Sequence, residues 1–260
     1  MNIFDKHFHF ISTDPRSSRT GCSKAYKIDS VFMQDRHDAF FYNYDLKDKT
    51  VLDIGCCVGA TGAYVLDKGA KFYHGIEYDQ ELVNVASKNL EQSFPKDLWN
   101  IEQGTLEEFS KENKTHYDVI VLSGVVYAVF DCIPVLTDLS KHTDAFVMEG
   151  MHPDFSKNIP NKVSNMLKQF NLWEDFLENA SFVEHNYIPM SIHKYVLFHG
   201  SRQSFGFIKN FLNSLGFENT NVVSNQLKNK IPYLYNSYNR YGERFEKVGD
   251  KQGLGYVGIQ

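Results

Sequence analysis

One stretch decides the fold of this 260-residue chain: Thr50-Val51-Leu52-Asp53-Ile54-Gly55-Cys56-Cys57-Val58-Gly59-Ala60-Thr61-Gly62. Residues 50–55 form a short apolar run that ends in glycine, as a buried parallel strand does. The glycines that follow allow a turn in which the backbone can approach a ligand closely. Residues 61–68 predict a helix, so the stretch is a strand, a turn and a helix of the kind that binds nucleotide-like ligands.

Strands and helices are predicted to alternate from this stretch to about residue 150. This pattern predicts an α/β fold, a Rossmann-like doubly wound sheet that is mainly parallel and has helices on both faces. Right-handed crossovers then bring the carboxyl ends of the strands to one edge, where such sheets bind ligands. The further strands are expected at Lys71–Glu77, Trp99–Gln103, Tyr117–Leu122 and Ala145–Glu149. One or two helices are expected at Lys24–Tyr44, one from Asp79 to Leu90, and one after the fourth strand through Leu139.

The alternation breaks after residue 150. We expect one domain over residues 1–260, because the segment after the break is too short to bury a core of its own. Its expected parts are an N-terminal helical segment (1–48), an insertion or cover (151–203) with a helix at Val163–Phe182, a helix at Ser204–Leu215, and C-terminal antiparallel strands at Phe217–Ser224 and Leu254–Gln260.

The turn resembles motif I of the class I S-adenosylmethionine-dependent methyltransferases, D/E-x-G-x-G-x-G. Asp53, Gly55 and Gly59 match it, and Cys57 replaces the middle glycine. A dinucleotide fingerprint would need glycine at Cys57 and Ala60, so a nicotinamide oxidoreductase is a distant alternative. The resemblance implies S-adenosylmethionine as cofactor and S-adenosylhomocysteine as product, with Asp53 available to the ammonium group of the cofactor.

The resemblance implies further cofactor contacts where the next strands end. Glu77 would bind the ribose hydroxyls and Tyr78 would flank the adenine. The family often has Gly-Asp where this chain has Gly104-Thr105, so either the side chain or the backbone of Thr105 is left for the adenine. Ser123–Tyr127 stands where the methyl donor meets the acceptor. The expected cofactor residues are Asp53, Gly55, Cys57, Gly59, Glu77, Tyr78, Thr105, Leu106 and Ser123.

Methyl transfer requires alignment of donor and acceptor, and a base only where the acceptor must lose a proton. Glu149 and His152 follow the fifth strand, and His199 precedes Arg202, a candidate for binding an anion. Plainer roles, as capping, sheet-edge or surface residues, stay open for each. The predicted catalytic residues are His152, Glu149 and His199, and the predicted substrate-binding residues are Tyr127, Arg202, Tyr238 and Arg240.

Three further groups of residues are weaker candidates. Asp131 follows the fourth strand, and a Tyr/Arg-rich stretch near the C-terminus is either a cover for the substrate or a solvated loop. A third group, before the first strand, either reaches the cofactor's carboxylate or forms an exposed helix face. The stretch contains Tyr233, Tyr235, Tyr238, Arg240, Tyr241 and Arg244, and the third group is Gln34, Arg36 and His37.

Composition limits the partners. The net charge of −5 argues against a broad nucleic-acid interface. The four cysteines lack metal-site spacing, so no metal is predicted and reduced thiols in a cytoplasm are expected. Because no apolar run approaches about 18 residues, no membrane span is predicted. We therefore expect a cytoplasmic protein with a small-molecule substrate, and we predict no particular oligomeric state.

The leading hypothesis is O-methylation of a small polar or anionic acceptor. The chain as a whole resembles methyltransferases of bacterial capsule clusters, including those that make the O-methyl phosphoramidate decoration. That resemblance implies a nucleotide-linked phosphoramidate or a sugar as acceptor in capsule polysaccharide biosynthesis. Two alternatives stay open: an enzyme that modifies the wobble uridine of transfer RNA, which residues 36–62 also resemble, and a non-catalytic partner subunit that binds the cofactor.

Overall fold

The computed structural model describes residues 2–15, 28–126, 129, 132–151, 161–172, 181–191, 194–203, 205–231 and 240–248. The helices are α1 (Ile3–Lys6), α2 (His9–Ser12), α3 (Ser30–Phe40), α4 (Ala60–Asp67), α5 (Gln80–Glu91), the 3-10 helix η1 (Lys96–Leu98), α6 (Leu106–Glu112), α7 (Cys132–Ser140), α9 (Asn161–Gln169), α11 (Phe205–Ser214) and α12 (Val222–Lys230). The strands are β1 (Thr50–Ile54), β2 (Phe72–Glu77), β3 (Trp99–Gln103), β4 (Tyr117–Ser123), β5 (Thr143–Met151), β6 (Ser181–Ser191), β7 (Lys194–Gln203), β8 (Phe217–Asn219) and β9 (Arg240–Lys247).

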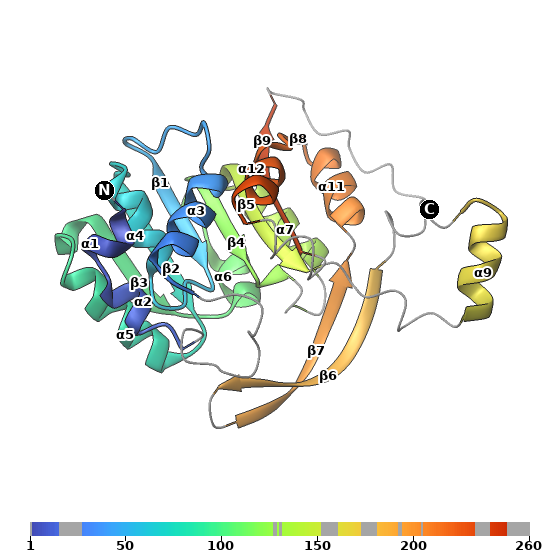
Figure 1. Cartoon of the computed structure of the whole chain (residues 1–260), viewed down its shortest axis with the longest axis horizontal. Coiled ribbons are helices and arrows are strands. Elements are labelled where there is room, and N and C mark those ends of the chain that lie inside the picture. Colours follow the sequence, from blue (N-terminus) through green and yellow to red (C-terminus); the bar gives the residue numbers. More distant parts are fainter. Residues whose placement is uncertain are drawn as a thin grey trace.

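A seven-stranded sheet with the order β3-β2-β1-β4-β5-β9-β8 forms the centre of the molecule (Figure 1). Strands β1 to β5 are parallel, whereas β9 runs antiparallel to both β5 and β8. The predicted Rossmann-like fold, mainly parallel with an antiparallel C-terminal strand, is therefore confirmed. The strand order reverses between β1 and β4, and ligands bind such sheets at this point beyond the carboxyl ends of the strands.

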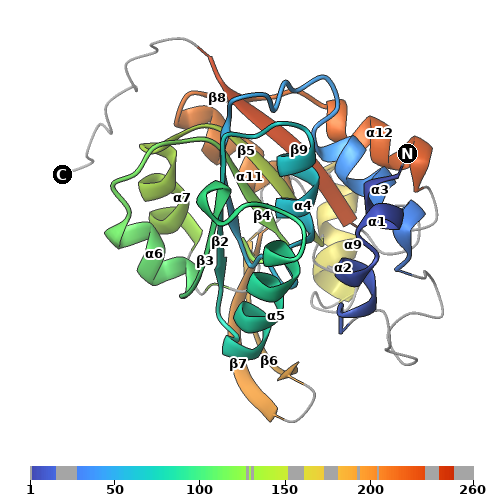
Figure 2. The ribbon, with the colours of Figure 1, turned by 90° about the vertical axis from the view of Figure 1, so that its left-hand side faces the viewer.

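Helices cover both faces of the sheet (Figure 2). Val51, Val119 and Val147 face a core formed with residues of α3, α4, α5 and α12. Their neighbours Leu52 and Ile120 face a second core, to which α6, α7 and α11 contribute. Because successive side chains of a strand point to opposite faces, the apolar runs of β1, β4 and β5 supply both cores.

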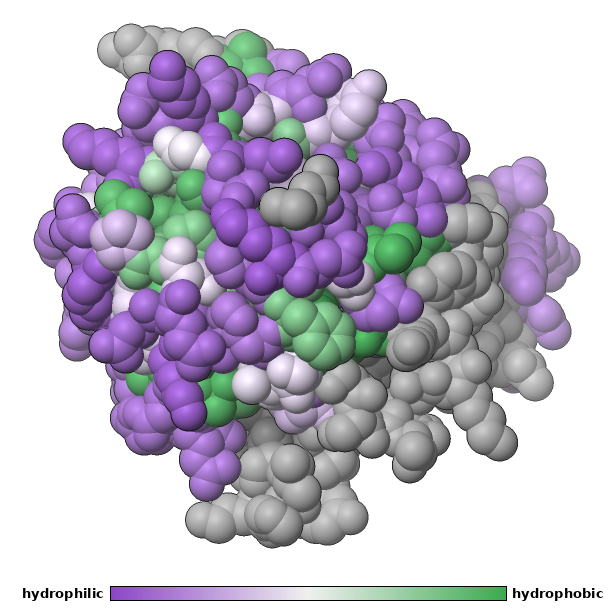
Figure 3. Space-filling view, turned by 60° about the vertical axis from the view of Figure 1, so that its left-hand side comes forward, coloured by the Kyte–Doolittle hydropathy of each residue, from purple (hydrophilic) through white to green (hydrophobic). Residues whose placement is uncertain are grey.

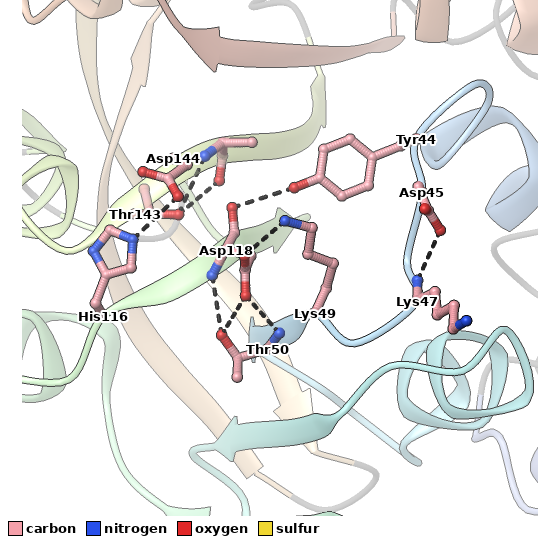
Figure 4. Close-up of polar contacts among 10 residues, drawn as sticks. Tyr44, Asp45, Lys47, Lys49, Thr50, His116, Asp118, Thr143 and Asp144 are labelled. Atoms are coloured by element: carbon pink, nitrogen blue, oxygen red, sulfur yellow. Dashed lines mark hydrogen bonds and ion pairs between the residues drawn. The ribbon is translucent and has the colours of Figure 1, made fainter. Parts of the chain in front are cut away.

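The amino ends of β1 and β4 are joined by a polar cluster around Asp118 (Figure 4). Its carboxylate accepts bonds from the N–H and hydroxyl of Thr50, each at 2.8 Å, and from Lys49 Nζ at 2.9 Å. Partial burial acts to raise the pKa of Asp118, but these hydrogen bonds hold it below its ordinary value. The cluster lies at the edge opposite the expected ligand edge, so we assign it to strand pairing.

The C-terminal strands differ from the sequence prediction in two ways. The strand predicted at Phe217–Ser224 ends at Asn219, because Asn221 adopts a positive φ of 55° and begins helix α12. The antiparallel strand next to β5 is β9, Arg240–Lys247, while Leu254–Gln260 lies outside the described residues. The sequence left Arg244 either in a cover for the substrate or in a solvated loop, whereas Arg244 and its neighbour Glu243 are only 3% and 4% exposed.

The region predicted as an insertion contains a short helix and a separate two-stranded sheet. The helix expected over Val163–Phe182 spans only Asn161–Gln169, and Phe182 belongs to β6. Strands β6 and β7 pair antiparallel with each other and are not hydrogen-bonded to the central sheet. That these residues cover the site stays a proposal.

The described part of the surface in Figure 3 is mostly hydrophilic, with small hydrophobic patches between polar side chains. Over the described ranges, no helix combines the length and the apolar character that a membrane crossing requires.

Candidate cofactor site and its neighbours

The turn between β1 and α4 has an unusual backbone. Gly55 and Gly59 both have a φ of 81°, a left-handed conformation that glycine adopts without strain. A Cβ atom at Gly55 would also clash with Cγ1 of Val125. Cys57 has a φ of 53°, so it takes the left-handed conformation although it replaces the expected glycine. The turn therefore keeps its compact shape with a cysteine at its centre.

Glu77 ends β2 beside this turn. Its Oε2 atom accepts a bond from the Cys57 N–H at 2.8 Å, and its Oε1 atom accepts one from the Asp79 N–H at 3.1 Å. Glu77 is only 9% exposed. Each carboxylate oxygen has two lone pairs, so Glu77 can hold the turn and still accept bonds from a ligand.

Asp53 lies beneath the turn and is only 2% exposed. Its Oδ2 atom accepts a bond from the Tyr73 hydroxyl at 2.9 Å. Burial raises the pKa of Asp53 to about 6, although hydrogen bonds with Tyr73 and Thr61 act in the opposite direction. The carboxylate is thus directed into the protein core, and we assign it to supporting the turn in place of the direct ammonium contact expected from the motif.

His37 joins the same buried network from α3. Its Nδ1 atom lies 2.7 Å from the carbonyl of Met33, and its Nε2 atom lies 3.3 Å from Thr61 Oγ1. Burial, together with the nearby Arg36, lowers the pKa of His37 to about 3. The imidazole is therefore neutral and belongs to the core, not to an exposed helix face or to the cofactor's carboxylate.

The expected adenine side of the site follows β2 and β3. Tyr78 is 57% exposed, and Leu106 is buried. Thr105 is the N-cap of α6: its hydroxyl donates to Glu108 Oε2 at 2.8 Å and accepts the Glu108 N–H at 3.2 Å. Because the Thr105 hydroxyl is occupied by the cap, we propose that an adenine contact at this position uses the backbone.

A buried ion pair links three elements at the carboxyl ends of β4 and β5. Arg36, from α3, donates through Nε to Glu149 Oε2 at 3.2 Å and through Nη2 to the same carboxylate. Arg36 Nη2 also donates to Ser123 Oγ, and Ser123 donates to Glu149 at 2.8 Å. Arg36 and Glu149 are 8% and 5% exposed. Arg36 is therefore no ordinary surface residue, and Glu149 is bound to a cation at the position predicted for a base.

The structure brings some of the other predicted residues to this edge. Arg240 pairs in register with Met151, the last residue of β5, so its backbone lies at the carboxyl edge of the sheet. His199 and Arg202 lie on β7, which continues to Gln203, and not in a loop before α11. Gln34 accepts the Ile3 N–H and donates to Asp38. Tyr127, Asp131, His152, Tyr233, Tyr235 and Tyr238 lie outside the described residues.

Three residues of the Tyr/Arg-rich stretch, Arg240, Tyr241 and Arg244, belong to strand β9 and not to a loop. Tyr241 pairs with Gly150. Arg244 is buried, and its Nη1 atom donates to the carbonyl of Tyr42 at 2.8 Å and to that of Phe40. Arg244 thus supports the C-terminal end of α3, the helix that carries Arg36. The prediction that Arg244 contacts the substrate or lies in a solvated loop is wrong, because its guanidinium is enclosed in the fold.

Comparison with known proteins agrees with this geometry. Residues 52–145, which run from β1 into β5, match the family model described as a methyltransferase domain. This part of the chain is similar to a methyltransferase domain. The chain resembles the ribosomal protein L11 methyltransferase of Pasteurella multocida, with 30% identity over 110 residues. That match covers 41% of this chain and 35% of the relative, so the chain spans about a third of the relative's length.

Solved structures share the fold of this chain at low sequence identity. A candidate S-adenosylmethionine-dependent methyltransferase of Listeria monocytogenes has a TM-score of 0.54 and 16% identity, and covers 82% of this chain and 98% of its own. Magnesium protoporphyrin IX methyltransferase of Synechocystis, solved with bound S-adenosylhomocysteine, has a TM-score of 0.52 and 12% identity, over 94% and 99% of the two chains.

The residues present fit S-adenosylmethionine, the cofactor of this class. Gly55 and Gly59 give the turn the left-handed backbone conformation that glycine favours, and Glu77 supplies a carboxylate beside the turn. Within the described ranges, no three His, Cys, Asp or Glu side chains lie close enough together to hold a metal ion.

Sequence reasoning missed the residues that support the site from other elements. Tyr73 and Thr61 were not singled out, although both are hydrogen-bonded to Asp53. The pairing of Arg36 with Glu149 joins residues 113 positions apart, and nothing in either local sequence identifies the partner. Their polar character within apolar surroundings is the one signal that could have identified them.

Proposed function

We propose that this chain transfers a methyl group from S-adenosylmethionine to an oxygen of a small polar or anionic acceptor. The observation that carries the proposal is the bond between Glu77 and the Cys57 N–H, which ties the end of β2 to the glycine turn after β1. This arrangement leaves a carboxylate for ribose hydroxyls at the point where the strand order reverses. When bound, the cofactor supplies a methyl group attached to a positively charged sulfur. An acceptor oxygen would take this methyl group, and the sulfur would leave as S-adenosylhomocysteine.

The role of the protein in such a displacement is alignment and exclusion of water. Glu77 binds the ribose, Tyr78 flanks the adenine, and Ser123 lies where the methyl group meets the acceptor. Arg36 and Glu149 fix the ends of β4 and β5 relative to α3. We propose Glu149 and His152 as the groups that receive a proton where the acceptor has one to lose, and His199 as a third candidate.

The proposed class of acceptor is supported by the residues near the carboxyl end of β5. Arg240 begins β9 next to the end of β5, which supports binding of an anionic group there. Together with Arg202 and Tyr238, and with Tyr127 after β4, it would bind a nucleotide-linked phosphoramidate or sugar such as capsule polysaccharide biosynthesis uses. An acceptor oxygen that is already anionic needs no base, whereas a sugar hydroxyl does.

Calorimetric titration with S-adenosylmethionine and S-adenosylhomocysteine tests the cofactor. We expect the wild type to bind both and Glu77→Ala to lose about ten- to a hundredfold in affinity, because it loses charge-assisted hydrogen bonds. Glu77→Gln, which keeps the size of the side chain, separates the loss of charge from the loss of shape. Asp118→Asn is the matched control, since Asp118 also accepts a backbone N–H but lies at the opposite edge.

Methyl transfer from labelled cofactor tests the acceptor. We expect label to enter phosphoramidate nucleotides or nucleotide sugars, and no label to enter transfer RNA. A cofactor titration in which folded wild-type protein binds neither compound would overturn the proposal. Cofactor binding without transfer to any small acceptor, but with transfer to transfer RNA, would reject the acceptor class alone.

A further inference from the structure

The backbone carbonyl of Val58 lies within the glycine turn and accepts a hydrogen bond from a neighbouring helix. Val58 stands between Cys57 and Gly59, both with positive φ, and is fully buried. Asn89, from α5, donates through Nδ2 to this carbonyl at 3.1 Å. A buried carbonyl needs such a partner, since an unpaired one costs free energy comparable to a lost hydrogen bond. Asn89 is itself 2% exposed.

The same amide nitrogen reaches the N-terminal segment Asn2–Pro15. Asn89 Nδ2 donates to Thr13 Oγ1 at 2.9 Å. In addition, His9 Nε2 lies 3.0 Å from the backbone carbonyl of Asn89 and 3.0 Å from Ser93 Oγ. The two hydrogens of the Asn89 side-chain amide thus link Thr13, which lies 76 positions upstream in the sequence, to the glycine turn.

We propose that Asn89 is a positioning residue for the cofactor turn, and that the N-terminal segment acts on cofactor affinity through it. The inference rests on the proposed function, because it requires that the turn bind the cofactor. Asn89 fixes the direction of the Val58 carbonyl, and hence the orientation of the two flanking peptide groups. The Cys57 N–H that Glu77 accepts belongs to the peptide group between Cys56 and Cys57, one residue before the earlier of these two. Thr13 keeps the amide of Asn89 in the orientation that this requires.

Asn89 has a matched control in the same protein. Asn113 is also buried, and its Nδ2 atom donates to a backbone carbonyl, that of Thr115, at 2.9 Å. Asn113 follows α6 and belongs to the other side of the sheet from α5. Replacement of either asparagine by alanine removes one buried amide, so the losses of stability are comparable and a change in affinity is specific to Asn89.

The experiment measures the affinity for S-adenosylhomocysteine by calorimetry at a temperature where every variant is folded. We expect Asn89→Ala to weaken binding about tenfold, the effect of a lost buried hydrogen bond and its unpaired partner. Asn113→Ala should bind within about twofold of wild type, as expected of a distant and independent site. With a working acceptor, Asn89→Ala should raise KM for the cofactor more than it lowers kcat.

Thr13 provides a milder test that does not risk the fold. Thr13→Val removes the hydroxyl that accepts from Asn89, and we expect about threefold weaker binding for one neutral hydrogen bond. Thr13→Ser keeps the hydroxyl and should restore wild-type affinity. Unchanged affinity in both Asn89→Ala and Thr13→Val, with a wild type that binds, would overturn the inference.

Failure of the proposed function gives a different result. In that case wild-type protein does not bind S-adenosylhomocysteine, and the claim about cofactor affinity is lost with it. Hydrogen exchange of the amides of residues 56–60 then measures the link itself. We expect faster exchange in Asn89→Ala than in Asn113→Ala, and equal exchange would show that Asn89 does not hold the turn.

Discussion

His37 and Asp53 share one hydroxyl group, that of Thr61. His37 Nε2 lies 3.3 Å from Thr61 Oγ1, and Asp53 is hydrogen-bonded to the same side chain. The carbonyl of Met33 can only accept, so Nδ1 of His37 carries the hydrogen and Nε2 is an acceptor. Thr61 has a single hydrogen for two acceptors, unless Asp53 is protonated and donates to Thr61. While Asp53 is ionised, Thr61 therefore donates to one of the two at a time.

The first prediction follows from Asp53, whose pKa is raised to about 6. An unfolded chain loses this proton near pH 3.9, so between about pH 4 and 6 the folded chain binds more protons. The contribution of Asp53 to the free energy of unfolding should therefore fall by about 2–3 kcal/mol as the pH rises through this window, which is read as the difference between wild type and a variant that lacks this carboxyl. Urea unfolding of Asp53→Asn, which cannot ionise, should lack this fall.

Asp45→Asn, an exposed carboxylate, is the control and should keep the wild-type pH dependence. A fall of equal size in wild type and Asp53→Asn would mean that Asp53 ionises in the folded chain as it does in water.

His37 should produce the opposite slope. Its pKa is lowered to about 3 in the folded chain, whereas an unfolded histidine binds a proton near pH 6.5. Below about pH 6.5 the unfolded chain therefore binds more protons, and the stability due to neutral His37 is lost as the pH falls. His37→Phe should be less sensitive to acid than wild type between pH 6.5 and 4.5, as followed by circular dichroism. A variant that is as acid-sensitive as wild type would contradict the assignment.

The third prediction concerns the buried pair of Arg36 and Glu149. Arg36→Met leaves Glu149 and Ser123 without their cation, and we expect a loss of about 3–5 kcal/mol in the free energy of unfolding. Lys6→Met, which breaks an exposed pair with Asp67, should cost about 0–1 kcal/mol. Guanidinium unfolding of both variants provides the comparison. The double variant Arg36→Met/Glu149→Leu should recover much of the stability but not the methyl transfer.

The fourth prediction compares two glycines that share a left-handed backbone conformation. Gly59 and Gly216 have φ values of 81° and 88°, and in neither case would a Cβ meet another atom closer than 3.5 Å. Alanine at either position should cost about 1–2 kcal/mol, because it must adopt a left-handed conformation. Only Gly59→Ala should weaken S-adenosylhomocysteine binding. Equal binding by the two variants would separate Gly59 from the cofactor site.

Local pattern was sufficient to predict the fold up to residue 151. The strands β1 to β5 are apolar runs bounded by turns, and their expected positions agree with those found to within about two residues. Beyond residue 151 the sequence pattern did not predict which charged side chains are buried. Arg244 is a charged residue, yet it is buried and donates hydrogen bonds to the carbonyls of Phe40 and Tyr42. No local sequence feature indicates these distant partners.

Within the site, the residues fixed by backbone geometry were predictable and those fixed by tertiary contacts were not. Gly55, Gly59 and Glu77 stand at the ends of β1 and β2, where strand pairing brings them together. Asn89 and Thr13 depend on how α5 and the N-terminal segment pack, which residue type and spacing do not specify.

Helix α3, which precedes β1, is contacted by parts of the chain that are made after β5. Lys230 Nζ lies 3.3 Å from Asp38 Oδ2, and Arg244 binds the carbonyls at the C-terminal end of α3. During synthesis on a ribosome, β1 to β5 are made before β9, and a domain generally folds as a unit. A nascent chain arrested before residue 240 would carry the residues of the glycine turn but would lack the β9 support of the helix that carries Arg36. The pairing of Arg36 with Glu149 therefore involves two elements that are both braced by a strand made after them.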